Sequence, residues 1–174
     1  MANILSEKLI NFRCYGEGGR ELLGLVDAEL PTLEAMSETI SGAGIAGELD
    51  SPTLGHYAPM SLTLKWRVTE PGALRLAAPK AHAIELRGAI QRWDASLGES
   101  SVRKLKVVVR AIPKSAPLGT LSAGGAQEPS AEFSVRYLKV FIDGRAYLEI
   151  DPVNSICVID GVDYLADVNA ALGV

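Results

Sequence analysis

A strict alternation of apolar and polar side chains is the feature of this sequence that most restricts its fold. Between Met60 and Val68, apolar residues occupy every second position, and Ser, Thr, Lys and Arg occupy the positions between them. Successive side chains of a β-strand point to opposite sides, so the pattern predicts a strand with one buried and one solvated face. We expect the core to contain the whole apolar set: Met60, Leu62, Leu64, Trp66 and Val68.

The same two-residue period recurs along the chain and predicts a mainly β protein. Further strands are expected at residues 8–14, 21–30, 33–40, 82–93, 101–112 and 132–142, with a turn at residues 16–19. Two segments favour short helices: residues 70–78, with Pro71 in the first turn, and residues 163–172, capped by Asp163 and ended by Gly173. Many strands joined by turns indicate an antiparallel β-sandwich or β-barrel.

The C-terminal part of the chain has the clearest turn signals. A strand from Arg136 to Ile142 is followed by Asp143-Gly144, which predicts a hairpin turn. A second strand, a break at Asp151-Pro152, a short strand and a second Asp-Gly turn at residues 160–161 complete the pattern before the final helix.

Length and composition indicate one domain. The chain has 174 residues, 48% of them hydrophobic, which is enough to form a core, so we treat residues 1–174 as a single domain. Residues 113–130 are rich in Pro, Gly, Ser and Ala and are expected to form a flexible loop rather than a linker, because the strands on both sides share their patterning. The chain has neither a bilayer-spanning apolar run nor a secretory signal, so we expect it to be made in the cytosol.

Charge is distributed unevenly along the chain. Residues 21–64 carry seven acids and no Lys or Arg, whereas residues 65–114 carry eleven bases and four acids. An acidic segment followed by a basic one suits head-to-tail pairing between copies, in which the acidic segment of one copy meets the basic face of another. Charge alone is equally compatible with compensation between neighbouring strands of one molecule. The net charge of −4 argues against recognition of duplex DNA.

Several motifs resemble parts of cofactor, metal or catalytic sites, but the residues around them do not complete such a site. Residues 42–47 match the dinucleotide-binding pattern G-x-G-x-x-G, but residues 48–55 cannot form the helix that this site needs, so a flexible extended arm is favoured. His56 and His82 have no nearby metal ligands, and Cys14 and Cys157 are far apart in sequence and expected to be reduced residues on strands. We therefore expect no catalysis, no metal and no cofactor.

Basic residues alternate along two of the predicted strands, which raises the question of whether this sheet face binds single-stranded nucleic acid. Such binding surfaces interleave aromatic side chains with the bases, and Trp93 is the single nearby candidate in the sequence. A solvated or inter-subunit sheet face is favoured for the basic set: Arg87, Arg92, Arg103, Lys104, Lys106 and Arg110.

The ordered set of these motifs resembles the major tail tube protein of contractile-tailed phages and R-type tailocins. The resemblance runs through Leu30-Pro31-Thr32-Leu33, the segment from Glu38 to Ile45, the strand from Met60 and the helix after it, and the C-terminal pattern Glu149-Ile150-Asp151, Asn154 and Gly161-Val162-Asp163. It implies two packed antiparallel sheets, similar to the type VI secretion tube, with two short helices and an extended arm.

The resemblance also implies a function and partners. Copies would form hexameric rings that stack into a rigid tube in the virion tail, assembled in the bacterial host cytoplasm. Implied partners are further copies of the chain, the tail sheath protein, the tape-measure protein, a baseplate tube initiator and a tail terminator. DNA would pass through the lumen without specific binding if the particle is a phage rather than a DNA-free tailocin. A monomeric β-barrel that binds a ligand or partner is the alternative.

Two sets of residues follow from the resemblance. Residues 32–57 would form the inter-subunit arm, with the following contact residues: Glu34, Glu38, Ile40, Gly42, Gly44, Ile45, Gly47, Glu48, Leu49 and Asp50. The lumen wall would draw on the polar strand faces, for which the candidates are Glu85, Arg87, Gln91, Lys104 and Lys106.

Overall fold

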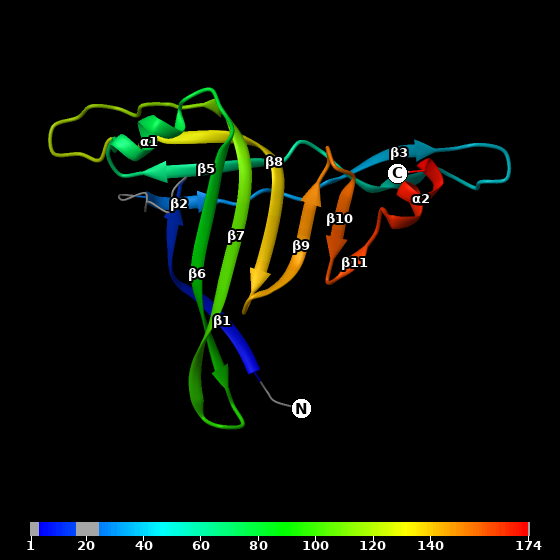
Figure 1. Cartoon of the computed structure of the whole chain (residues 1–174), viewed down its shortest axis with the longest axis horizontal. Helices are drawn as coiled ribbons and strands as arrows, with labels where there is room; N and C mark the ends of the chain where they lie inside the picture. Colours follow the sequence, from blue (N-terminus) through cyan, green and yellow to red (C-terminus); the bar gives the residue numbers. More distant parts are fainter. Residues whose placement is uncertain (1–3, 17–24, 174) are drawn as a thin grey trace.

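The computed structural model describes residues 4–16 and 25–173, and it confirms a mainly β, antiparallel fold with two short helices (Figure 1). The elements are β1 (Ile4–Tyr15), β2 (Leu25–Glu29), β3 (Ala35–Ile40), β4 (Leu49–Tyr57), β5 (Ser61–Trp66), α1 (Pro71–Leu76), β6 (His82–Asp94), β7 (Glu99–Ser115), β8 (Ser130–Ile142), β9 (Arg145–Asp151), β10 (Ile156–Ile159), β11 (Val162–Asp163) and α2 (Ala166–Leu172). The predicted turn at 16–19 and the predicted strand residues 21–24 lie almost wholly outside the described ranges.

A single large antiparallel sheet folds back on itself to make the body of the protein. Its strands follow the order β1-β6-β7-β8-β9-β10-β11, while β5 pairs with the first half of β8 and β2 pairs with β5. In Figure 1, β5 and β2 run across β6 and β7, so they form a second layer over them. The register of β7 against β8 shifts between Arg110 and Ala111, where β8 passes from one layer to the other.

The core fills the space between these two layers. Alternate residues of β5 point inward, and Phe133 of β8 and Val109 of β7 meet them with no exposed surface. Met60, Leu62, Leu64 and Trp66 are buried as the alternation predicts. The prediction for Val68 is wrong: its side chain is 45% exposed, because β5 ends at Trp66 and the chain turns toward α1.

The ends of the two helices follow the sequence signals only in part. Pro71 opens α1, and Gly173, with a φ of 76°, ends α2 in the left-handed conformation that favours glycine. The predicted cap of α2 by Asp163 is wrong. Asp163 belongs to β11, where it pairs with Val158, and its Oδ1 accepts a hydrogen bond from the Leu165 amide at 3.0 Å, one residue before the helix begins.

The loop after β7 is shorter than predicted and folds back on itself. Strand β7 extends to Ser115, so the connection spans residues 116–129. Within it, Gln127 accepts a backbone hydrogen bond from Thr120 and donates one to the Arg67 carbonyl, both at 2.9 Å. The Gln127 side chain also donates to the Leu118 carbonyl and accepts from the Thr69 amide. These contacts fix the two ends of the loop, and its flexibility stays a prediction.

Candidate assembly surfaces

Strands β3 and β4 form a hairpin that stands apart from the main sheet. They pair with each other in a separate two-stranded sheet, with Glu38 opposite Ser51 and Ile40 opposite Leu49. Figure 1 shows the hairpin projecting at one end of the molecule, beside α2. The G-x-G-x-x-G residues form its turn, in which the Ile45 amide bonds to the Gly42 carbonyl at 3.1 Å. A turn between antiparallel strands is not the strand-to-helix junction that holds a dinucleotide.

One face of this hairpin is uncovered and carries three exposed apolar side chains. Met36 and Ile40 lie on β3 on either side of Glu38, Leu49 lies opposite Ile40, and the three apolar side chains are 53%, 43% and 57% exposed. A two-stranded hairpin is marginally stable by itself in water, and it gains stability when an apolar surface packs against it. The hairpin therefore has the composition of an element that is completed by contact with another surface. Sequence analysis predicted β3 but missed β4, because Pro52 and Gly55 interrupt its alternation.

The hairpin also carries the acidic residues predicted for the arm. The carboxylates of Glu34, Glu38, Glu48 and Asp50 are exposed and make no ion pair with any residue in the described ranges. They are thus available to bases outside the molecule. The remaining predicted arm residues, Gly42, Gly44, Ile45 and Gly47, lie in the exposed turn.

The base of the hairpin is anchored to the C-terminal segment. The buried side chain of Leu165 lies directly over Gly55, so that a Cβ atom at position 55 would come within 2.6 Å of Leu165 Cδ2. The Cys157 thiol lies 3.9 Å from the Tyr57 hydroxyl, and the Ala58 amide bonds to the Glu34 carbonyl at 2.8 Å. These contacts set the direction in which the hairpin leaves the body.

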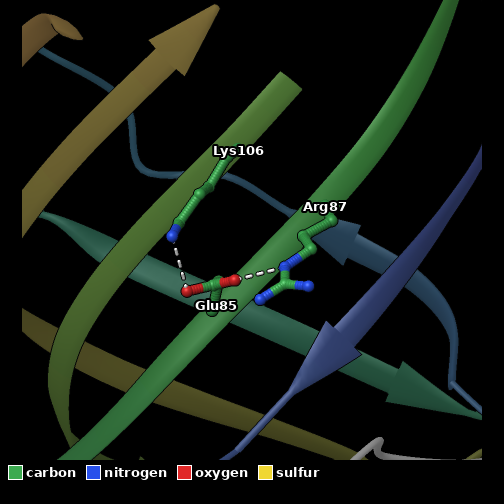
Figure 2. A network of polar contacts seen from close by, with 3 residues as sticks. All are labelled: Glu85, Arg87 and Lys106. Atoms are coloured by element: carbon green, nitrogen blue, oxygen red, sulfur yellow. Dashed lines mark hydrogen bonds and ion pairs between the residues drawn. The ribbon is translucent and has the colours of Figure 1, made fainter. Parts of the chain in front are cut away.

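The second candidate surface is the outer face of β6 and β7. Arg87 lies opposite Lys106 in the register, and the Glu85 carboxylate bridges them, with 3.0 Å between Glu85 Oε2 and Lys106 Nζ (Figure 2). Partial burial raises the pKa of Glu85, but hydrogen bonds and attraction from Lys106 and Arg87 together outweigh burial and hold this pKa below its usual value. The charges on this face are therefore partly neutralised by one another.

All five predicted lumen residues lie on this outer face. Residues 85, 87 and 91 alternate on β6, and residues 104 and 106 alternate on β7, in positions opposite to the buried Leu86 and Val107. Gln91 donates a hydrogen bond to Glu7 Oε2 at 2.5 Å. The structure brings the five residues together, and their place on a lumen wall stays a proposal.

Aromatic side chains from neighbouring strands also lie on this face, which corrects the expectation that Trp93 was the single aromatic near the bases. The Arg87 guanidinium lies 4.6 Å from the centre of the Tyr15 ring, and Lys106 lies 5.6 Å from Phe141. Sequence spacing did not indicate these contacts, because Tyr15 on β1 and Phe141 near the end of β8 lie far along the chain from the bases that they contact. Each contact holds a cation over a ring and reduces its freedom to bind elsewhere.

The residues set aside in the sequence analysis lie in structural positions. His82 is buried, with its Nε2 3.0 Å from the Ala78 carbonyl oxygen. Cys14 and Cys157 are buried on β1 and β10, and burial raises the pKa of the Cys14 thiol to about 12. Within the described ranges, no group of three His, Cys, Asp or Glu side chains is placed to hold a metal, and no helix is long and apolar enough to cross a membrane.

The ion pairs around Glu85 lead to a prediction about stability and pH. A lowered carboxyl pKa stabilises the fold above the unfolded-state pKa, and this stabilisation is lost as the pH falls through the folded-state pKa. We expect Glu85→Gln to lower the free energy of unfolding at pH 7 by about 0.5–1 kcal/mol and to flatten its pH dependence between about pH 5 and 3. Urea unfolding at several pH values measures both effects. Glu99→Gln, which removes an exposed acid from the same sheet, is the control, and identical pH profiles for Glu85→Gln and the wild type would contradict the assignment.

The sequence matches the model of a known protein family over nearly its whole length. Residues 6–173 match the family model described as phage tail tube protein FII, so the match includes both the hairpin and the charged face. No curated protein matches the sequence.

Proposed function

This chain belongs to the phage tail tube protein family, and we propose that its copies form hexameric rings that stack into the inner tube of a contractile phage tail or tailocin. The family supports a structural role in the virion tail and self-association in a tube. The hexamer, the contractile tail and the assembly in the host cytoplasm are the parts that we add. The observation that carries the proposal is the uncovered β3–β4 hairpin, which exposes apolar side chains and acids that make no ion pair among the described residues.

The hairpin acts in this proposal as the arm that joins subunits. A segment that cannot bury its own apolar side chains gains order when a neighbour covers them. The arm is acidic, whereas residues 65–114 are rich in bases, so a second copy offers the complementary charge. Contacts between arms and bodies of successive copies would not close on themselves, and repeated contacts of this kind give a tube of indefinite length.

Exposed strand edges provide a second means of association. Among the described residues, β1 and β11 lie at the two ends of the long strand order, and each pairs along one side only. Unpaired edges recruit further strands. Rings in which the edges of adjacent copies meet would remove these edges, as closure does in a β-barrel.

The charged outer face of β6 and β7 is the surface that we assign to the lumen. A conduit must let DNA or a tape-measure protein pass without gripping it. The face is polar, and its bases are partly neutralised by Glu85 and held over Tyr15 and Phe141. In this arrangement the sheath protein contacts the outside of the tube, and the baseplate initiator and tail terminator contact its two ends.

The alternative, a monomeric binding module, has less support. Drug-sized ligands occupy pockets of roughly 300–1,000 Å³. The apolar groove bordered by Leu9, Phe12 and Leu105 has a volume of about 80 Å³. A hollow of about 370 Å³ reaches this range, but it is lined mostly by charged and polar side chains, which include Asp27 and Lys65, whereas ligand pockets are lined mostly by apolar ones. Size-exclusion chromatography with light scattering tests the proposal directly. Species with six times the 18.5 kDa mass of the chain, or multiples of that mass, support it, and a monomer that binds a small ligand would support the alternative.

Reversing the charge of the arm should block assembly without unfolding the monomer. Glu38 and Asp50 are exposed and unpaired within the described residues, so Glu38→Lys combined with Asp50→Lys changes little in the isolated chain. We expect the double variant to keep its circular dichroism spectrum and melting temperature while losing tubes in electron micrographs. Normal tubes from this variant would contradict the electrostatic role of the arm.

A further inference from the structure

An apolar groove lies where the second layer of the fold ends. Its floor is formed by Leu86 and Val107, and its rim carries Leu9 and Leu30, which are about half exposed. Strand β2 ends at Glu29, so the lower parts of β6 and β7 continue beyond the layer that covers them. The groove is therefore a part of the core face that this chain does not cover with its own described residues.

Gly88 keeps the groove open. It lies on β6 between the inward-facing Leu86 and Ile90, and it is paired with Phe12 on one side and Leu105 on the other. The absence of a side chain here leaves a depression in a row of large apolar residues. A Cβ atom at this position would meet Leu9 Cδ1 at 2.9 Å and Leu105 Cβ at 3.6 Å. Any side chain at position 88 would thus displace the end of the Leu9 side chain and occupy the floor of the groove.

We propose that this groove receives the exposed apolar side chains of the β3–β4 hairpin of a second copy. The inference rests on the proposed function, because it identifies where the arm binds. The hairpin presents Met36, Ile40 and Leu49 on one face, and the groove presents exposed Leu9 and Leu30. The apolar side chains of both surfaces are exposed, so each set can cover the other.

The charges around the two surfaces are complementary. Glu38 lies between Met36 and Ile40 on the same face of the hairpin. Arg92 lies on the groove side of β6, two positions after Ile90. The charge of Arg92 attracts Asp94 and Asp143, but its Nε is buried without a hydrogen-bond partner among the described residues. A carboxylate from the arm would satisfy this donor. A buried donor that gains a charged acceptor is stabilised more than one that bonds to a neutral group.

The occupant is a second copy rather than the chain's own arm. Leu165 over Gly55 and the Tyr57–Cys157 contact hold the base of the hairpin against the C-terminal segment. In Figure 1 the hairpin extends beyond β9, β10 and β11, on the side of the molecule away from β1 and β6. To reach its own groove, the arm would have to break these anchors, whereas an adjacent copy can meet it without any rearrangement.

A cross-linking experiment with two variants tests this assignment. One population carries an affinity tag and Ile40→Cys, and the other is untagged and carries Leu9→Cys, so that a tagged–untagged cross-link can form only between copies. Tubes assembled from the mixture are treated with a short bis-maleimide. The controls are Thr39→Cys and Asn11→Cys, which lie on the opposite faces of the same two strands. Unmodified protein reports any reaction of Cys14 and Cys157.

We expect the Ile40–Leu9 mixture to give at least about tenfold more cross-linked dimer than either control mixture. Tubes that form without this excess would overturn the assignment of the groove and leave the proposed function intact. A wild-type protein that never assembles would instead overturn the proposed function.

Filling the groove provides a test that needs no cysteine. Gly88→Val suits a strand, and its Cβ atom would displace only the end of the flexible Leu9 side chain. We expect this variant to fold with an unchanged circular dichroism spectrum and to need at least about tenfold more protein for assembly, equivalent to about 1.4 kcal/mol. Assembly of folded Gly88→Val at wild-type concentrations would overturn the proposal.

Discussion

Phe133→Ala should lower the free energy of unfolding by about 3–5 kcal/mol. Phe133 has no exposed surface, and it lies on β8 at the point where this strand pairs with Leu62 of β5 on one side and with Pro113 of β7 on the other. The ring therefore ties the two layers of the fold together, and its removal leaves a cavity between them. Total stabilities of domains are about 5–15 kcal/mol, so the variant should be partly unfolded at 37 °C and should not assemble.

Urea unfolding followed by tryptophan fluorescence measures this change. Ser134→Ala is the matched control, because residue 134 lies next to Phe133 on β8 with its side chain on the opposite face. The control should stay within about 0.5 kcal/mol of the wild type. A loss below about 1 kcal/mol for Phe133→Ala would show that the layers are not joined through this residue.

Gly55→Ala should release the arm from the body. The φ angle of Gly55 is 68°, a left-handed conformation that costs an alanine about 1–2 kcal/mol. The added Cβ atom would also lie 2.6 Å from the buried side chain of Leu165, which would have to move. We expect faster hydrogen exchange in β4 and around Leu165, and a loss of tubes, because the arm would no longer leave the body in a fixed direction.

Substitutions of two other glycines in the arm separate the effect of backbone strain from the effect of the Leu165 contact. Gly42→Ala adds a methyl group without a left-handed φ and with open space around it, whereas Gly44→Ala adds the strain of a φ of 92° alone. The expected order of damage is Gly42→Ala, then Gly44→Ala, then Gly55→Ala. Equal effects of Gly44→Ala and Gly55→Ala on assembly would show that backbone strain, and not the Leu165 contact, controls the arm.

Local patterns predicted the strands well because one face of each strand meets a common core. The alternation from Met60 to Trp66 survives in the structure as a buried row, and the Asp-Gly pair at Asp143 and Gly144 makes the predicted hairpin between β8 and β9. These features depend on neighbours in sequence. The mainly β, antiparallel fold with two short helices was accessible from them.

Features that depend on residues distant in sequence could not be predicted. Val68 lies at an alternate position that would face the core if the strand continued, but β5 ends at Trp66 and the Val68 side chain is exposed. Aspartate is a residue type that often caps helices, but Asp163 pairs with Val158 in β11 instead. Strand β4 was missed because Pro52 and Gly55 interrupt its alternation and most of its side chains are exposed.

For the candidate surfaces, too, local sequence predicted some features, and contacts between distant residues determined the others. The family resemblance implied an extended arm at residues 32–57, and the structure shows that residues 35–57 form a hairpin with exposed apolar side chains around Glu38 on one face. The aromatic partners of Arg87 and Lys106 come from β1 and β8, which lie more than thirty positions away in sequence. The groove around Gly88 arises because β2 ends early, which is a property of tertiary packing.

Electron microscopy of the purified protein over a concentration series tests the central claim most directly. The series should be run with and without short tube fragments as seeds, so that a slow nucleation step does not hide assembly. We predict six-fold rings at low concentration and hollow tubes at high concentration or after seeding. A protein that stays monomeric at every concentration, with seeds present, would contradict the account.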